Sequence, residues 1–467
     1  MSLPPPAVPL SATAVAPAHA APSHPRRLGV WHAISVCVGM VVGAGIFKTS
    51  PMVAQSLASD HALYAAWALG GLLSFVGALC FAELASAFPD AGGDYFFLRL
   101  AYGRWLGLLF AWSRFAVIHT GSMALLAFVF GDYLGQLVHF GPALAPYSSA
   151  LFAAAAIGVL MVVNLRGIHW GLGTQVGLMA LVIAGMLAVG LAGAVLVLQG
   201  QAPATPLANA VVTAERPAWG VALVFVFLAY GGWSDAATLS SEMRDARRGI
   251  VHALLGGLAI VAGLYLLANW AYLQGLGLDG LAQSPAPAAA LMRRAFGPLG
   301  ELLIVAVVAI TSLSVMNALL ISGARTTYAA ARDLPRRTAL AAWDPSRGIP
   351  PVSVIAMGAV ALALVGLGTA TRGGFATMVD YLSPVYWFFL MLSGGAVIVL
   401  RWRLPGAPRP FRVPLFPLLP LLFSGCSAYL LWSSVTYVKA GAVVGLAVLV
   451  LGALLLWPLS RSAPAAA

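Results

Sequence analysis

Long runs of apolar residues, separated by short polar stretches, occupy most of the chain from residue 30 to residue 460. A helix needs about 20 consecutive apolar residues to cross the hydrocarbon core of a bilayer. Twelve segments meet this requirement, which predicts an all-α polytopic membrane protein with 12 transmembrane helices. They cover residues 30–58, 61–88, 104–138, 148–164, 170–198, 218–241, 249–273, 298–329, 351–369, 374–400, 414–435 and 438–460.

The composition agrees with this pattern. Of the 467 residues, 61% are hydrophobic and 8% are charged, whereas a soluble domain carries about 25% charged residues. The net charge of +11 would point to nucleic acid in a soluble chain, but here it reflects basic loops beside a lipid bilayer. Cys37, Cys80 and Cys426 all fall in apolar segments without metal-binding spacing, so we expect no metal and no cofactor.

The distribution of basic residues predicts the orientation in the membrane. With a cytosolic N-terminus, 18 of the 25 Lys and Arg residues fall on the inner side and six, Lys48 among them, on the outer side. Such an excess marks cytosolic loops, so we expect both termini in the cytosol and the chain in the cell (inner or plasma) membrane. The predicted divisions are a disordered tail (1–27), a ten-helix core (28–402), two further helices (403–461) and a tail (462–467).

The first segment contains small, flexible residues at its centre, around Gly43 and Gly45. Irregular backbone at membrane depth is tolerated where it lines a protein cavity, and an interrupted span is typical of a transporter binding site. The alternative is that both glycines let another helix pack closely. This segment alone does not favour either interpretation.

A second interruption lies in the sixth segment, where Gly231 and Gly232 precede the polar residues Ser234 and Asp235. The two interrupted segments are five segments apart. Interruptions at corresponding positions of two five-helix halves are expected of an inverted-repeat transporter. The pair therefore favours a binding site over close packing.

Five sequence stretches resemble the amino acid–polyamine–organocation superfamily, and within it bacterial permeases similar to L-type amino acid transporters. They are GAGIF at 43–47, FAELASAFP at 81–89 with AGGDY at 91–95, AYGGW at 229–233, RTTYAAARD at 325–333 and PFRVP at 410–414. The resemblance implies a five-plus-five inverted repeat of the LeuT type, with helices 1 and 6 broken mid-membrane. It also implies transport of amino acids by alternating access.

An amino acid is a zwitterion, and the broken segments offer a partner for each of its charges. The N–H groups of Ala44, Gly45 and Ile46 begin a half-helix, whose N-terminal end attracts a carboxylate, and Gly43 allows close approach. Free carbonyls at the ends of the two broken helices suit the ammonium group. The candidates for these carbonyls are Val41 and the run from Leu228 through Gly231, which consists of Leu228, Ala229, Tyr230 and Gly231.

Specificity must come from side chains that face the pocket. The resemblance places Ser122 and Leu125 of the third segment and Leu319 of the eighth in the pocket wall. None of them is charged, which favours a neutral amino acid over arginine or a polyamine. A different small amine remains the alternative substrate, and plain helix packing remains the alternative role for Ser122.

The chain departs from the resemblance at two positions. Relatives often carry a bulky aromatic gate at the start of the sixth break, where this chain has Leu228 beside Phe227. Many also carry a lysine in the fifth segment, which aligns with Val182. With neither that amine nor a sodium-ligand cluster, we expect exchange or proton-linked uptake.

Ionisable residues inside membrane segments are functional candidates. Arg114 is expected either to extend towards the cytosol or to pair with Glu83 in an inner gate. His119 is either a proton relay or a hydrogen-bonded core residue. Asp235 should order the inner half of the sixth helix, and Glu242 forms inner-gate ion pairs with the arginines after it or lies in a solvated loop. Glu83, His119 and Asp235 are the proton-carrying candidates.

Three other classes of protein were weighed. A membrane enzyme would need a convergent cluster of Asp or His residues, and the 14 acidic residues form none in the sequence. A channel would need a repeated filter or a ring of charges. A sensor would need an added soluble domain. A transporter therefore remains the favoured interpretation, and the sequence carries no signal for an oligomeric state.

Overall fold

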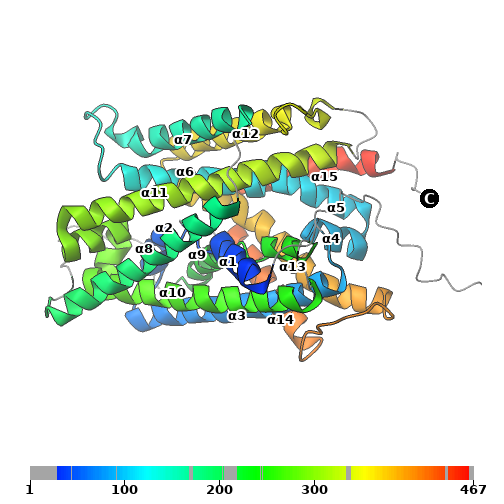
Figure 1. The fold of residues 1–467 in the computed structure, drawn as a ribbon, viewed down its shortest axis with the longest axis horizontal. Coiled ribbons are helices and arrows are strands. Elements are labelled where there is room, and N and C mark those ends of the chain that lie inside the picture. Colours follow the sequence, from blue (N-terminus) through cyan, green and yellow to red (C-terminus); the bar gives the residue numbers. More distant parts are fainter. Residues whose placement is uncertain are drawn as a thin grey trace, which may run out of the picture.

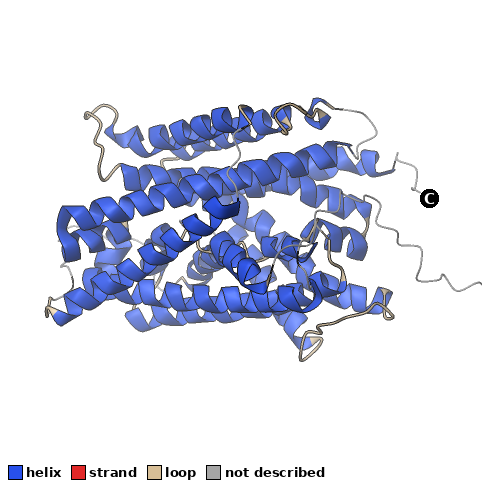
Figure 2. Ribbon diagram, viewed as in Figure 1, coloured by secondary structure: helices blue, strands red, loops and turns tan. Residues whose placement is uncertain are grey.

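The computed structural model describes residues 29–43, 45–90, 92–167, 172–201, 203, 218–241, 243, 246–332, 338–436 and 440–461. Within these ranges the regular structure is helical, and an isolated bridge pairs Asp344 with Ile349 (Figure 2). Eleven described helices are long and apolar enough to cross a membrane, and a bent pair of helices makes up to twelve. The predicted all-α polytopic class is confirmed.

The helices follow the predicted segments to within a few residues, except where kinked helices continue past the expected ends. They are α1 (Val30–Val41), α2 (Ile46–Ser56), α3 (Asp60–Ala87), α4 (Asp94–Tyr102), α5 (Arg104–Ser113), η1 (Arg114–His119), α6 (Thr120–Leu134), η2 (Ala145–Tyr147), α7 (Ser148–Leu165), α8 (Leu172–Leu198), α9 (Trp219–Tyr230), η3 (Asp235–Ser241), α10 (Ala246–Gln283), α11 (Pro287–Arg332), η4 (Ala339–Ala341), α12 (Pro351–Ala370), α13 (Phe375–Arg403), α14 (Leu418–Thr436) and α15 (Ala440–Arg461). The two longest, α10 and α11, kink at Gly277 and Gly297, each with φ 69°.

Three of the predicted spans are irregular inside. The first is divided into α1 and α2, whose axes differ by 49°. The sixth ends as an α-helix at Tyr230 and continues, after a turn, as the 3₁₀ helix η3. The third is continuous from Arg104 to Leu134 but includes the π-helix η1, a rare element that often occurs at functional sites.

The broken helices lie in the interior of the bundle. Figure 1 shows α1 and α9 between a lower group, which includes α3 and α10, and an upper edge formed by α7 and α12. In the apolar stretch of α9, 72% of residues are buried, against 28% in α7 and 22% in α15. The outer helices expose large apolar side chains such as Val159 and Leu454, which suits contact with lipid. The interior position of the breaks protects them from lipid.

Candidate functional site

The backbone opens between α1 and α2. α1 ends at Val41, and the N–H groups of Lys48 and Thr49 donate to the Gly45 carbonyl as α2 begins. The first turn of any helix has N–H groups without intrahelical acceptors, so the start of α2 can receive a carboxylate. Ile46 is fully buried there, while Ala44 lies outside the described residues.

The space around the two glycines distinguishes a cavity from close packing. A Cβ added at Gly45 would meet no heavy atom within 4 Å, and one at Gly43 would meet only the nearby Gly45 nitrogen, at 4.0 Å. Glycines that mediate packing look different: a Cβ at Gly70 would lie 2.2 Å from Val226, and one at Gly77 would lie 2.5 Å from Phe423. Gly43 and Gly45 therefore border open space rather than a neighbouring helix.

The break in the sixth span touches the break in the first. Gly232 has φ +102°, and a Cβ added there would lie 2.5 Å from the carbonyl oxygen of Met40. A side chain would thus be strained by the backbone and blocked by α1, so glycine is required. The sequence correctly placed both breaks, and the structure brings them into contact.

A tyrosine that the sequence analysis did not single out joins the two broken helices. The Tyr265 hydroxyl, on α10, lies 3.0 Å from the Val41 carbonyl oxygen and 2.8 Å from the Ala229 carbonyl oxygen. A hydroxyl has one hydrogen, so it donates to one carbonyl at a time. The signal in the sequence was a tyrosine within an apolar span, because a buried phenol needs an acceptor.

Two of the carbonyls predicted to bind the ammonium group therefore already accept hydrogen bonds within the protein. Val41 is one of the two carbonyls reached by Tyr265, whereas the Leu228 carbonyl accepts the Gly231 N–H at 3.1 Å within its own turn. The Tyr230 hydroxyl donates to the carbonyl of Trp67 at 3.2 Å. The carbonyls that converge between the breaks are those of Val41 and Ala229, and both belong to the set that the sequence analysis named.

The predicted pocket walls lie on helices that pack side by side. Ser122 and Leu125 are on α6, which packs along α11, and α11 carries Leu319. Leu125 is buried, and the other two are half-buried. Val182, which takes the place of the lysine seen in relatives, is buried on α8.

The gate candidates of the sixth break differ in their environment. Phe227 is buried and packs edge-on against Trp387 of α13, with ring centroids 6.0 Å apart. Leu228 is only half-buried. The phenyl ring is therefore part of the packing between α9 and α13.

An ion pair lies on the side of the break towards which α2 runs, which we call the outer end. Lys48 Nζ lies 2.7 Å from the carboxylate of Asp132 on α6 and donates to the Pro285 carbonyl at 2.8 Å. The sequence analysis counted Lys48 as an outer loop charge, and this was wrong, because the residue is 7% exposed within α2. Close by, Tyr133 donates to the carbonyl of Phe47 at 2.8 Å.

A second ion pair lies at the opposite, inner end, where α1 begins. Arg114, at the start of η1, lies 2.5 Å from the carboxylate of Asp235 at the start of η3. The same guanidinium donates from Nε to His119 Nε2 at 3.1 Å. Because a guanidinium only donates hydrogen bonds, His119 Nε2 is the acceptor in this contact.

Both expectations for Arg114 were therefore wrong. It neither extends into solvent, since its side chain is 11% exposed, nor pairs with Glu83. The Glu83 carboxylate instead receives Arg401 of α13 through two hydrogen bonds, at 2.8 and 2.5 Å, together with the Val413 N–H at 2.6 Å. Arg409 adds a second cation at 3.5 Å. Glu83 thus attaches the chain between α13 and α14 to α3, while Glu242 lies outside the described residues.

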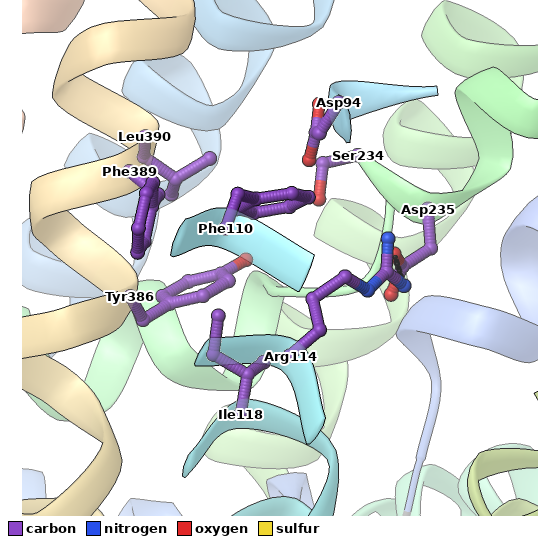
Figure 3. A pocket seen from close by; sticks show the side chains of 9 residues that line it. All are labelled: Asp94, Phe110, Arg114, Ile118, Ser234, Asp235, Tyr386, Phe389 and Leu390. Atoms are coloured by element: carbon purple, nitrogen blue, oxygen red, sulfur yellow. Dashed lines mark hydrogen bonds and ion pairs between the residues drawn. The ribbon is translucent and has the colours of Figure 1, made fainter. Parts of the chain in front are cut away.

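The inner ion pair borders a small pocket that contains a carboxyl group absent from the predicted set. Asp94, at the start of α4, lines it (Figure 3). The other lining residues are Phe110, Arg114, Ile118, Ser234, Asp235, Tyr386, Phe389 and Leu390. α4 is outside the membrane-spanning helices, and burial raises the pKa of Asp94 to about 8, with Arg114 opposing the rise and Asp235 adding to it. The AGGDY stretch contained this residue, but its burial was not visible in the sequence.

The described residues include no group of three or more His, Cys, Asp or Glu side chains that could hold a metal ion. Two broken spans that meet beside open backbone, with an ion pair at each end, are the architecture of a membrane carrier that binds its ligand mid-membrane. That architecture defines the class of protein.

The comparisons with known proteins supply the family. The model of the amino acid permease family matches residues 28–455, and the chain belongs to this family. It is 28% identical to the large neutral amino acids transporter small subunit 2 of Mus musculus, over 91% of this chain and 80% of the relative. It is 28% identical to the serine/threonine exchanger SteT of Bacillus subtilis (strain 168), over 88% and 91%. The b(0,+)-type amino acid transporter 1 of Homo sapiens is 27% identical, over 87% and 82%.

Proposed function

We propose that this permease carries neutral L-amino acids across the cell membrane by alternating access, and that the start of α2 binds the substrate carboxylate. The open space around Gly43 and Gly45 carries this proposal. A carboxylate can approach the N–H groups there, and the helix dipole favours a negative charge. Close packing of these glycines, the competing interpretation, predicts crowding that the structure does not have.

The proposal of a neutral substrate rests on the carbonyls and the uncharged side chains near the break. The carbonyls of Val41 and Ala229 offer acceptors for an ammonium group, and Ser122, Leu125 and Leu319 offer uncharged walls. Of the relatives named above, one is named as a transporter of large neutral amino acids and one as a serine/threonine exchanger, and the third is named only as a b(0,+)-type amino acid transporter. A polyamine would need carboxylates in the wall.

We further propose exchange as the transport mode, with proton-linked uptake as the second candidate. Two of the expected proton carriers are engaged: Glu83 with two arginines and Val413, and His119 with Arg114. Asp235 is paired with Arg114. All three candidates thus have partners within the protein, which favours exchange as the simpler mode.

The orientation with both termini in the cytosol is supported by the distribution of basic residues. Reporter fusions test it directly: a fusion after Arg461 should read cytosolic, and fusions within residues 201–215 should read external. An external C-terminus contradicts the orientation.

Counterflow tests the function. Purified protein is reconstituted in vesicles loaded with one unlabelled amino acid, and uptake of the labelled form is followed without sodium. We expect transient accumulation that saturates, first for substrates found in a thermal-shift screen, because ligands that bind the folded state raise its unfolding midpoint. Linear uptake without counterflow points to a channel, and uptake that requires sodium contradicts the proposed coupling.

A further inference from the structure

The Asp94 carboxyl group is buried, and one of its two oxygens lacks a hydrogen-bond partner in the described part of the chain. The residue is 7% exposed, and its Oδ1 has no hydrogen-bond partner among the described residues. It lines the pocket that also contains the ion pair between Arg114 and Asp235 (Figure 3). An ionised carboxylate in such a position is strongly disfavoured, so the group is held as the neutral acid in this closed arrangement.

The pocket lies between two groups of elements. α4 packs against α5 and α13, and η1 packs against the same two helices, so Asp94 and Arg114 belong to one group. η3, which carries Asp235, packs against α1, α3 and α10. The ion pair between Arg114 and Asp235 is therefore a link across the boundary, whereas an interaction between Asp94 and Arg114 would remain on one side of it.

We propose that Asp94 is a proton-binding site of the inner gate: its protonated form keeps the gate closed, and loss of its proton to the inner solution favours opening. This inference rests on the proposed transport function. It concerns how readily the inner end opens and assigns Asp94 no part in binding the amino acid.

Two electrostatic effects of ionising Asp94 act in the same direction. The new carboxylate repels Asp235 across the boundary, and it competes with Asp235 for the Arg114 guanidinium. Once the gate opens, Arg114 loses Asp235 as a partner, and ionised Asp94 then balances its charge. A guanidinium left buried without a carboxylate would be costly, so opening and proton release assist each other.

Few other ionisable groups face this carboxyl. The charges that act on it are Arg114 of η1 and Asp235 of η3, and the Tyr386 phenol of α13 lines the same pocket. The remaining cations of α13 are directed elsewhere: Arg401 binds Glu83, and Arg403 donates to the Ala101 carbonyl at 3.0 Å. His119 lies beyond the guanidinium, which donates to it.

The sign of the pH dependence follows from the two states of the gate. Burial raises the pKa of Asp94 to about 8 in the closed state, and an open, hydrated state beside Arg114 brings it back towards the ordinary value of about 4. Protonation therefore stabilises the closed state at low pH. This stabilisation is complete below about pH 4, falls by up to about ten-fold in the closed-to-open ratio per pH unit above that, and is lost as the pH rises through about 8.

The test is exchange in vesicles with the same pH on both sides, from about pH 5.5 to about pH 8.5. Equal pH removes any proton driving force, so the profile reports gating alone. We expect wild-type exchange to rise about five-fold or more across this range. Asp94→Asn, which resembles the protonated acid, should exchange slowly at every pH, and Asp94→Glu should retain a rising profile.

Asp90→Asn is the matched control, because it removes a carboxylate from the same connection while the Asp90 side chain caps only the Gly92 N–H. It should keep the wild-type profile. A thermal unfolding midpoint close to wild type shows that Asp94→Asn is folded. A flat wild-type profile, or an Asp94→Asn profile that still rises, overturns the proton site while leaving the transport function intact. Absence of exchange by wild type at every pH contradicts the transport function itself.

Discussion

The outer and inner ends of the broken helices each carry an ion pair of one cation and one carboxylate, but the two pairs are built on different elements. At the outer end the cation, Lys48, belongs to a broken helix, and its carboxylate, Asp132, belongs to the third span. At the inner end the third span supplies the cation, Arg114, and the broken sixth span supplies the carboxylate, Asp235. Both ion pairs thus join the third span to a broken span. The third span supplies the carboxylate at the outer end and the cation at the inner end.

The two ion pairs are similar to each other, but the groups that surround them differ. Lys48 has a second acceptor in the carbonyl of Pro285, which is a neutral group that does not titrate. Arg114 has a second acceptor in His119, and a second carboxyl group, Asp94, lines its pocket. The comparison predicts that the outer end responds to pH less than the inner end, because only the inner pair has a competing acid.

The largest effect on uptake should come from a substitution at the start of α2, which both ends share. Gly45→Leu fills the open space at the start of α2 and covers its N–H groups, so uptake should fall to background, about a hundred-fold or more if carboxylate binding is lost. Counterflow measures the loss, and the unfolding midpoint shows whether the protein is intact. Gly366→Leu, at an exposed helix position with open space around it, is the control and should transport normally. Normal uptake by folded Gly45→Leu rules out this site.

A smaller effect should separate the two ends. Lys48→Met should favour opening outwards and Arg114→Met opening inwards, because each removes one link and leaves its carboxylate unpaired. With the native cysteines replaced and Ser122→Cys as the reporter, labelling by an impermeant maleimide should rise about ten-fold from the corresponding side, which equals ~1.4 kcal/mol.

The controls for this pair of variants are surface ion pairs. Arg293→Met and Arg347→Met break the pairs with Glu301 and Asp344, in which the arginine side chains are 65% and 56% exposed, and pairs with a solvated arginine contribute little. They should leave the labelling unchanged. If Lys48→Met and Arg114→Met increase labelling from the same side, the two pairs do not close opposite ends.

The smallest effect on transport should come from the other inner ion network. Glu83→Gln breaks a buried cluster with Arg401 and Arg409 and should lower the free energy of unfolding by about 3 kcal/mol. The pH profile of exchange should keep its wild-type shape, because Glu83 holds the α13–α14 connection and does not border the gate pocket. A flattened profile would show instead that Glu83 carries the titrating proton.

The spans and their two breaks were predictable because they are local. A run of apolar residues interrupted by Gly43 and Gly45, or by Gly231 and Gly232, indicates a broken span without reference to any other part of the chain. The same holds for the candidate carboxylate site, which is backbone and needs no distant partner. The contact between Gly232 and Met40 could only be expected from the family resemblance.

The ion pairs were not predictable in the same way, because each joins residues far apart in the chain. Glu83 and Arg401 are separated by 318 positions, and Arg114 and Asp235 by 121. Periodicity identifies a charge as intramembrane but does not select its partner. Lys48 was misplaced for a related reason, since one lysine in a short half-helix cannot be told from a loop charge without the bend. Asp94 was part of a recognised stretch, but its burial depends on the packing of α4 against α13.

The π-helix in the third span also affects how this protein is compared with its relatives. A π turn holds about one residue more than an α turn, and one residue corresponds to about 100° of rotation. A straight helical wheel drawn from α5 through α6 would therefore assign Ser122 and Leu125 to the wrong face. The structure stabilises this offset from outside the helix: the Tyr381 hydroxyl donates to the Ala116 carbonyl at 2.6 Å. Alignments through residues 114–119 should accordingly allow a one-residue gap in relatives whose third helix is regular.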